Sequence, residues 1–221
     1  MSDTVLSFLL GVIQGLTEFL PISSSAHLLL PSLLFGFNDL GLSFDIAVHA
    51  GTLIAVIYYF RKEIVLMFKS FLLTDVNLLP HRNLAISLIV ATIPIILAGL
   101  FVKDFIDERV FNIEHIAMAN IIFAGILLFA YLKRKDIKNL YSVTLYSALF
   151  VGVFQSLALF PGASRSGTAI TAALLLGFNL KDASKFSFML SIPTIFGALV
   201  LLIIEMQSTL EAFNYMNLIL G

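Results

Sequence analysis

Two short polar stretches interrupt an otherwise apolar sequence, and the first carries groups suited to acid–base chemistry. It is QGLTEFLPISSSAH, residues 14–27. Gln14 and Glu18 are four residues apart, so both side chains lie on one helix face, one turn apart. A serine run and His27 follow directly. Glu18 and His27 are our candidates for proton transfer, and structural hydrogen bonding is the alternative role for each.

The second stretch, PGASRSGT at residues 161–168, is suited to binding an anion. Arg165 is the only one of the 13 lysines and arginines that lies within an apolar segment. Its guanidinium group matches the geometry of a phosphate or a carboxylate. Glycine, hydroxyls and backbone amides at the start of a helix add to such a site. The alternative is a structural salt bridge, for which Glu18 is the candidate partner.

The rest of the composition is that of an integral membrane protein. Hydrophobic residues make up 59% of the chain, charged residues 12%, and the mean hydropathy is +1.01. The net charge of −1 gives no basic surface for nucleic acid, and the absence of cysteine excludes thiol chemistry. An ionised carboxylate at the bilayer centre costs about 2.5 to 3.5 kcal/mol. Glu18 and Arg165 therefore need partners, and a functional site supplies them.

Helices long enough to cross a bilayer need about 20 apolar residues. Four segments meet this requirement and are predicted as full spans: 44–60, 83–102, 113–132 and 184–204. Two longer apolar runs, 4–37 and 143–178, contain the polar stretches. Because broken backbone at membrane depth must be satisfied by protein or by a wet cavity, each run is predicted to form a re-entrant helical hairpin.

The two broken runs resemble each other. LLGVIQGLTEFLPISSS aligns with FVGVFQSLALFPGASRS, which pairs Gly11 with Gly152 and Gln14 with Gln155 at a shift of about 141 residues. LLFGFN and LLLGFN match at the same shift. We therefore predict a single all-α membrane domain with two repeats, at about 4–132 and 143–221. The alignment places Leu159 opposite Glu18, and Ser24 or Ser25 opposite Arg165.

Loop charges orient the repeats. Segments 61–82 and 133–138 are rich in Lys and Arg, which predicts a cytoplasmic location, whereas 38–43 and 103–112 carry few and are predicted outside. The two hairpins then enter the membrane from opposite sides. Inverted repeats with broken helices bring their polar turns together near the midplane.

The repeat also predicts elements beyond the last residue. A shift of about 141 residues places counterparts of 83–102 and 113–132 at about 224–243 and 254–273, past Gly221. The tail NYMNLILG resembles the start of a further span. The sequence leaves two alternatives open, a short version of the architecture or a chain without two C-terminal spans.

These motifs resemble those of the undecaprenyl-diphosphate phosphatase family, also called bacitracin-resistance proteins. One family motif is a Glu/Gln-x-x-x-Glu helix with a serine run and histidine, met here by Gln14, Glu18, Ser23, Ser24 and His27. The other is Pro-Gly-x-Ser-Arg-Ser-x-x-Thr, met by Gly162, Ser164, Arg165 and Ser166. The threonine position of that motif holds Ala169, with Thr168 one place earlier.

The resemblance implies a function in the bacterial inner membrane. The family hydrolyses undecaprenyl diphosphate to undecaprenyl phosphate and inorganic phosphate, which recycles the lipid carrier for peptidoglycan synthesis and confers bacitracin resistance. It also implies six spans plus two re-entrant hairpins and dependence on a divalent cation, Mg²⁺ or Ca²⁺. A homodimer is a candidate assembly.

We expect the polar residues to divide the work of this reaction. Phosphate binding is expected of Arg165, helped by Gln14, Ser23, Gly162, Ser164, Ser166 and Thr168. Glu18 and His27 would transfer protons, and Glu18 is also the candidate cation ligand. The attacking group is either water or Ser24. The alternative function is a polyprenyl-phosphate flippase or transporter built on the same inverted repeat.

Overall fold

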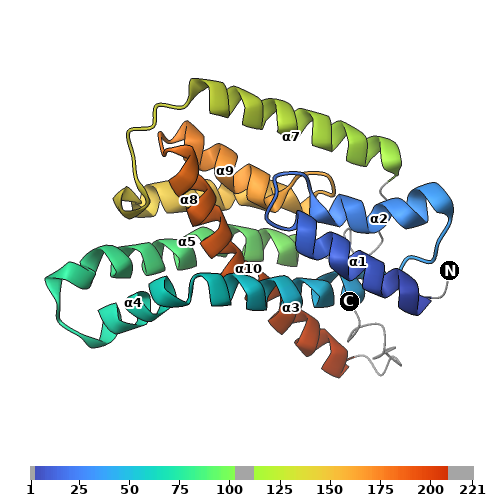
Figure 1. Ribbon diagram of the computed structural model, residues 1–221, viewed down its shortest axis with the longest axis horizontal. Coiled ribbons are helices and arrows are strands. Elements are labelled where there is room, and N and C mark those ends of the chain that lie inside the picture. Colours follow the sequence, from blue (N-terminus) through green and yellow to red (C-terminus); the bar gives the residue numbers. More distant parts are fainter. Residues whose placement is uncertain (1–2, 103–111, 209–221) are drawn as a thin grey trace.

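The computed structural model describes residues 3–102 and 112–208, and the named elements of this part of the chain are all helices, as predicted (Figure 1). The helices are α1 (Asp3–Thr17), α2 (Ser24–Phe35), α3 (Gly41–Tyr59), α4 (Arg61–Leu72), α5 (Leu79–Phe101), α7 (Ile113–Lys133), α8 (Leu145–Ser156), α9 (Arg165–Leu175) and α10 (Leu180–Ser208). Three short 3-10 turns join them: η1 (Val76–Leu78), η2 (Leu140–Ser142) and η3 (Leu157–Leu159). The C-terminal tail that resembles a further span lies outside the described residues.

Three helical segments of the described chain are long and apolar enough to cross a membrane: Val76–Phe101, Ile113–Lys133 and Leu180–Leu201. They coincide with three of the four predicted spans. The fourth, 44–60, forms most of α3, which bends by 73° into α4. That bent pair qualifies as a span only when its two helices count together. The described residues therefore contain three candidate spans, or four with the bent pair.

Both apolar runs break where the polar stretches predict. α1 ends at Thr17 and α2 begins at Ser24, with Ser23 as the N-cap residue whose Oγ accepts the Ala26 N–H. In the second run η3 ends at Leu159, and α9 begins after Ser164, whose Oγ accepts the Gly167 N–H. These caps satisfy amides that a helix start leaves unpaired. Serines in both stretches therefore shape the backbone at the breaks.

The helices of the second broken run are packed deep in the protein. α8 lies against α5 so closely that a Cβ atom at Gly152 would be 2.3 Å from the carbonyl oxygen of Ala91. α9 is buried along most of its length and contacts α7, α8 and α10. In Figure 1, α10 crosses the other helices obliquely and α7 forms one edge of the molecule. The tight α5–α8 contact gives the second break a rigid support.

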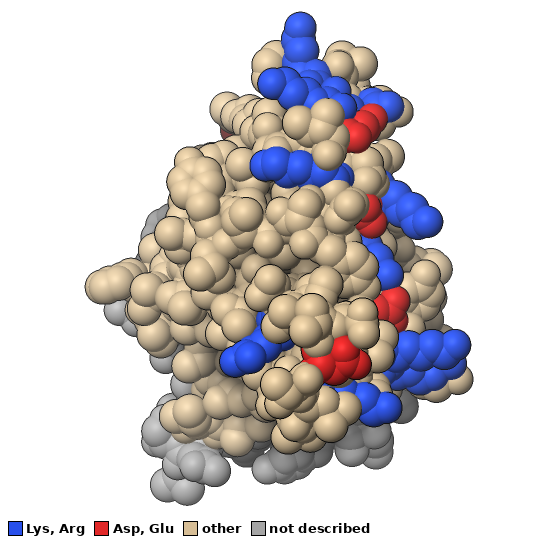
Figure 2. Space-filling model, turned by 90° about the vertical axis from the view of Figure 1, so that its left-hand side faces the viewer, with Lys and Arg blue, Asp and Glu red and all other residues tan. Residues whose placement is uncertain are grey.

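Basic residues gather at one end of the molecule. The connections after α4 and α7, and the one from α9 to α10, lie at the left-hand end in Figure 1. Figure 2 faces this end and shows Lys and Arg side chains distributed across it. The segments predicted to be cytoplasmic therefore lie on the same side, as the positive-inside rule requires. Both helix breaks lie nearer the middle of the long axis (Figure 1).

Candidate active site

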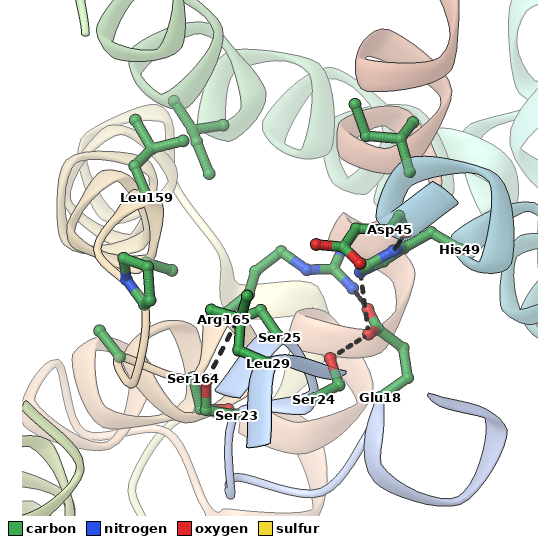
Figure 3. A pocket seen from close by; sticks show the side chains of 15 residues that line it. Glu18, Ser23, Ser24, Ser25, Leu29, Asp45, His49, Leu159, Ser164 and Arg165 are labelled. Carbon is green, nitrogen blue, oxygen red and sulfur yellow. Dashed lines mark hydrogen bonds and ion pairs between the residues drawn. The ribbon is translucent and has the colours of Figure 1, made fainter. Parts of the chain in front are cut away.

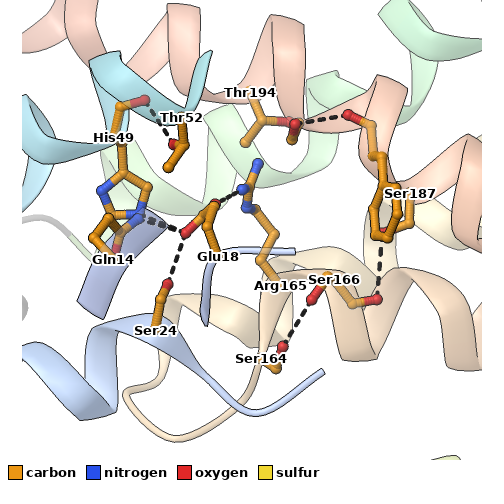
Figure 4. Close-up of polar contacts among 12 residues, drawn as sticks. Gln14, Glu18, Ser24, His49, Thr52, Ser164, Arg165, Ser166, Ser187 and Thr194 are labelled. Atoms are coloured by element: carbon orange, nitrogen blue, oxygen red, sulfur yellow. Dashed lines mark hydrogen bonds and ion pairs between the residues drawn. The ribbon is translucent and has the colours of Figure 1, made fainter. Parts of the chain in front are cut away.

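The two helix breaks meet in the folded chain, although they are more than 100 residues apart in sequence. Ser166 donates a hydrogen bond of 2.9 Å from its Oγ to the carbonyl oxygen of Leu20, and Ser164 approaches the same oxygen at 3.5 Å. The two serine hydroxyls are 3.0 Å apart (Figure 4). These bonds hold the start of α9 beside the first break, so that the N-termini of α2 and α9 border one cavity.

That cavity has a volume of about 250 Å³ and is lined by residues of both helix breaks, of α3 and of α5 (Figure 3). Its polar residues are Glu18, Ser23, Ser24, Ser25, Asp45, His49, Ser164 and Arg165. Apolar side chains complete the wall, among them Leu29, Ile46, Ile95 and Leu159. Leu159, which aligns with Glu18 in the repeat, lies on the opposite side of the cavity from Glu18 in Figure 3. The cavity is therefore polar on one side and apolar on the other.

Glu18 is the centre of the polar side. Its side chain is only 2% exposed, and its Oε2 accepts hydrogen bonds from Gln14 Nε2 at 2.6 Å and from Ser24 Oγ at 2.7 Å. His49 Nε2 lies 3.3 Å from the same oxygen. Arg165 Nη2 forms an ion pair with the other carboxylate oxygen, Oε1 (Figure 4). Four polar side chains thus offset the cost of burying this carboxylate.

Arg165 has more hydrogen-bonding capacity than its pair with Glu18 uses. Its side chain is 17% exposed, and it lines the cavity from the first residue of α9. The buried Nη1 has no hydrogen-bond partner among the described residues. An unpaired buried donor costs about 1 to 3 kcal/mol, and a charged one costs more. A phosphate oxygen would satisfy it, so the pair with Glu18 leaves Arg165 able to bind an anion.

Five of the predicted site residues line the cavity: Glu18, Ser23, Ser24, Ser164 and Arg165. Gln14 is buried behind Glu18 and reaches the site through it. The remaining four do not line it. Ser166 joins the two breaks instead, while Gly162 and Thr168 line a second cavity, on the α7 side, that also includes Ser164.

His27 lies apart from the acid and the arginine that we expected it to join. Its Nδ1 is 2.8 Å from the carbonyl oxygen of Ser23, one turn earlier, and the ring does not line the cavity around Glu18. Thr168 behaves similarly, since its hydroxyl donates to the carbonyl oxygen of Arg165 at 3.0 Å. Both side chains bond to the first turn of their own helix. The structure therefore gives them local contacts at the helix starts.

Two residues of α3 that the sequence motifs did not include also line the cavity, Asp45 and His49. Figure 3 shows both side chains projecting from α3 toward Glu18 and Arg165. The available signal was their spacing, because an acid and a histidine four residues apart share one face of a span. The same spacing had singled out Gln14 and Glu18.

The described residues do not form a protein-held metal site. No three His, Cys, Asp or Glu side chains within residues 3–102 and 112–208 are grouped to hold a metal ion. Glu18, the expected ligand, already has contacts at both carboxylate oxygens, three of them with hydrogen-bond donors of Gln14, Ser24 and Arg165. A metal ion at Glu18 would have to share the carboxylate with these donors. In this arrangement Glu18 is a hydrogen-bond acceptor.

Comparison with known proteins agrees with the motifs. From residue 7 to residue 221 the sequence matches the family described as bacitracin resistance protein BacA. The chain belongs to the BacA family. It is also 50% identical over 194 residues to an undecaprenyl-diphosphatase of Saccharophagus degradans (strain 2-40), across 87% of this chain and 73% of that protein. In this BacA chain, the two motifs that carried the resemblance are the two breaks that border the cavity.

Proposed function

We propose that the chain hydrolyses undecaprenyl diphosphate to undecaprenyl phosphate and inorganic phosphate in the cavity around Glu18. The observation that carries the proposal is the arrangement of three side chains. Ser24 donates to one oxygen of Glu18 while Arg165 pairs with the other. This places a nucleophilic hydroxyl, a base and a phosphate-binding cation in contact. A flippase needs charge neutralisation but no hydroxyl aligned on a base, so the arrangement favours the enzyme.

The geometry supports a direct route for the reaction. Arg165 and the amides at the starts of α2 and α9 bind the diphosphate and neutralise charge on its oxygens. Ser24 Oγ, 2.7 Å from Glu18 Oε2, gives its proton to that oxygen and forms a bond to the terminal phosphorus. The bond to the bridging oxygen breaks, and undecaprenyl phosphate leaves with the electron pair. Water then displaces Ser24 from the phosphorus.

The divalent cation implied by the resemblance belongs with the substrate in this proposal. Mg²⁺ commonly binds phosphate oxygens and keeps several waters, with few protein ligands. Such an ion on the diphosphate would offset the charge of its oxygens without requiring a cluster of protein ligands. This placement agrees with the hydrogen bonds that Glu18 already accepts from Gln14, Ser24 and Arg165. The steps above use only the side chains of the chain itself.

An apolar groove gives the prenyl tail a place next to the site. The second cavity, of about 290 Å³, shares Ser164 with the first and is lined on one side by α7. A further cavity of about 470 Å³ shares Pro21, Ala124 and Leu127 with it and continues along α7. Both are predominantly apolar in their lining residues. We therefore place the tail beneath α7, with the diphosphate at Arg165.

The same proposal includes the membrane topology. The two broken runs are taken as re-entrant hairpins of inverted repeats in the bacterial inner membrane, with the basic end in the cytoplasm. Recycling of the carrier would supply undecaprenyl phosphate for peptidoglycan synthesis. By consuming undecaprenyl diphosphate, the enzyme would also lower the cell's sensitivity to bacitracin, in keeping with the family name.

Phosphate release from a purified sample tests the proposal. The chain in detergent with Mg²⁺ or Ca²⁺ should release inorganic phosphate from a polyprenyl diphosphate. Glu18→Gln and Arg165→Ala should each lower kcat by about 10³-fold. Arg134→Ala, a matched change in a loop where Arg134 pairs with Asp136, should keep the wild-type rate. Folded wild-type protein that releases no phosphate with either ion would refute the enzyme function.

A further inference from the structure

His49 contacts the proposed base from a third element, outside both breaks. It lies on α3, its side chain is 22% exposed, and its Nε2 is 3.3 Å from Glu18 Oε2. Its other ring nitrogen, Nδ1, contacts the carbonyl oxygen of Asp45, one turn earlier. Glu18 Oε2 thus faces Ser24 and His49 at once (Figure 4). The three groups form a row in the order hydroxyl, carboxylate, imidazole.

The contact at Nδ1 decides which nitrogen of His49 can accept a proton. A main-chain carbonyl oxygen only accepts hydrogen bonds, so Nδ1 must carry a hydrogen. In the neutral ring, Nε2 then carries the lone pair, and this lone pair faces Glu18 Oε2. Two lone pairs in contact are stabilised when one proton enters between them. The Asp45 carbonyl therefore holds the imidazole in the tautomer that can receive a proton from Glu18.

We propose that His49 is a positioning residue that shares with Glu18 the proton released by Ser24. When Ser24 Oγ attacks, its O–H bond breaks and the proton moves along the existing hydrogen bond to Glu18 Oε2. There the lone pair of His49 Nε2 accepts a hydrogen bond from it. The distance of 3.3 Å is long for such a bond, and contacts of this kind tighten as the reaction proceeds. The protonated carboxyl is stabilised, which makes Glu18 a more effective base.

The proton returns in the second half of the reaction. When water attacks the phosphoryl group, the bond from phosphorus to Ser24 Oγ breaks and the shared proton goes back to that oxygen. The protons of the water leave with inorganic phosphate. The pair of Glu18 and His49 is then ready for another cycle, with no net gain or loss of protons on the protein.

Other charged groups near the His49 ring also influence its protonation. Asp45 lies on its own helix, Glu18 follows α1 and Arg165 begins α9. α10 also packs against α3, but its lysines 181 and 185 line a different cavity together with Tyr59, at the far end of α3. The groups that face His49 are thus two carboxylates and one guanidinium. Substitution of His49 tests its role in their presence.

The inference rests on the proposed function, and a His49→Gln variant tests it separately. Glutamine can donate to Glu18 or accept from it, but its amide is far less basic than an imidazole and takes up little of the shared proton. Compared with wild type, kcat for phosphate release should fall about 10²-fold while KM stays within about twofold. The acidic limb of the kcat–pH profile should move to lower pH, because Glu18 alone is a weaker base. His115→Gln, a change on the exposed start of α7, is the control.

A second variant of His49 gives an independent test of the inference. His49→Ala leaves space in the cavity, and added imidazole should restore part of kcat, increasingly as more of the imidazole is neutral. The inference is overturned if His49→Gln stays within twofold of wild type. It is also overturned if the loss is equal at every pH without imidazole rescue, or if both variants lose the fold by size-exclusion chromatography. Failure of wild-type protein to release phosphate would instead refute the proposed function.

Discussion

The two helix breaks are built alike but have different contacts. In the first, Gln14 donates to Glu18, and Ser24 donates to the same carboxylate. In the second, the equivalent Gln155 has Leu159 where Glu18 would be, and its amide reaches Thr194 at 3.4 Å. The second break contributes Arg165 instead. The first break therefore supplies the carboxylate and the hydroxyl, and the second supplies the guanidinium.

This division shows how two helix breaks of similar sequence can form an asymmetric site. A carboxylate in both breaks would place like charges in one buried cavity, and an arginine in both would do the same. One of each gives an ion pair that a buried site tolerates. The hydrogen bonds from Ser164 and Ser166 to Leu20 keep the unlike halves together. Each half is incomplete as a phosphatase without the other.

The largest expected difference in kcat is between variants of two serines, one from each helix break. Ser24→Ala should lower kcat by about 10³-fold with little change in KM, because it removes the attacking oxygen. Ser166→Ala loses a bond to a carbonyl oxygen and should lower kcat by less than about tenfold. Phosphate release measures both. Mass spectrometry of quenched reactions should find a phosphoryl group on Ser24 in wild-type protein, and full activity of Ser24→Ala would favour water as the attacking group.

The next difference is expected in stability, between glycines of α8 and α1. Gly152→Ala in α8 would force a Cβ atom against the Ala91 carbonyl, and overpacking of this kind costs about 1 to 3 kcal/mol. Gly15→Ala in α1 has no other atom within 4 Å of the added Cβ and should be neutral or slightly stabilising. Thermal unfolding in detergent should show a lower Tm for Gly152→Ala only. Equal Tm values would contradict the tight support of the second break.

The smallest expected difference in kcat is between variants of Gln14 and Gln155, the two glutamines that align in the repeat. Gln14→Leu removes a hydrogen bond that holds the Glu18 carboxylate in position beside Ser24, and the misplaced carboxylate should lower kcat about tenfold. Gln155→Leu removes only the contact with Thr194 and should keep kcat within about twofold. Steady-state phosphate release distinguishes them. Similar losses in both variants would indicate that the two glutamines share a structural role.

Much of the site was predictable because a charged side chain inside an apolar segment needs a partner or a functional site. Glu18 and Arg165 were singled out by the free energy that a charged side chain costs inside a membrane. The internal repeat predicted that the two helix breaks that carry them would meet. His49 was missed although Asp45 lies one turn before it, because its contact with Glu18 depends on how α3 packs. His27 was expected in the cavity because it follows the serines. Its place in the first turn of α2 directs the ring to the Ser23 carbonyl instead.

The most direct test of a site shared by both breaks is a double-mutant cycle on phosphate release. Glu18→Gln and Arg165→Ala are measured singly and together, with radiolabelled substrate to follow slow rates. If both side chains act on one bound diphosphate, the double variant should be about as slow as the slower single variant. Losses that multiply, to about 10⁶-fold from two losses of about 10³-fold, would show independent roles and contradict a single shared site.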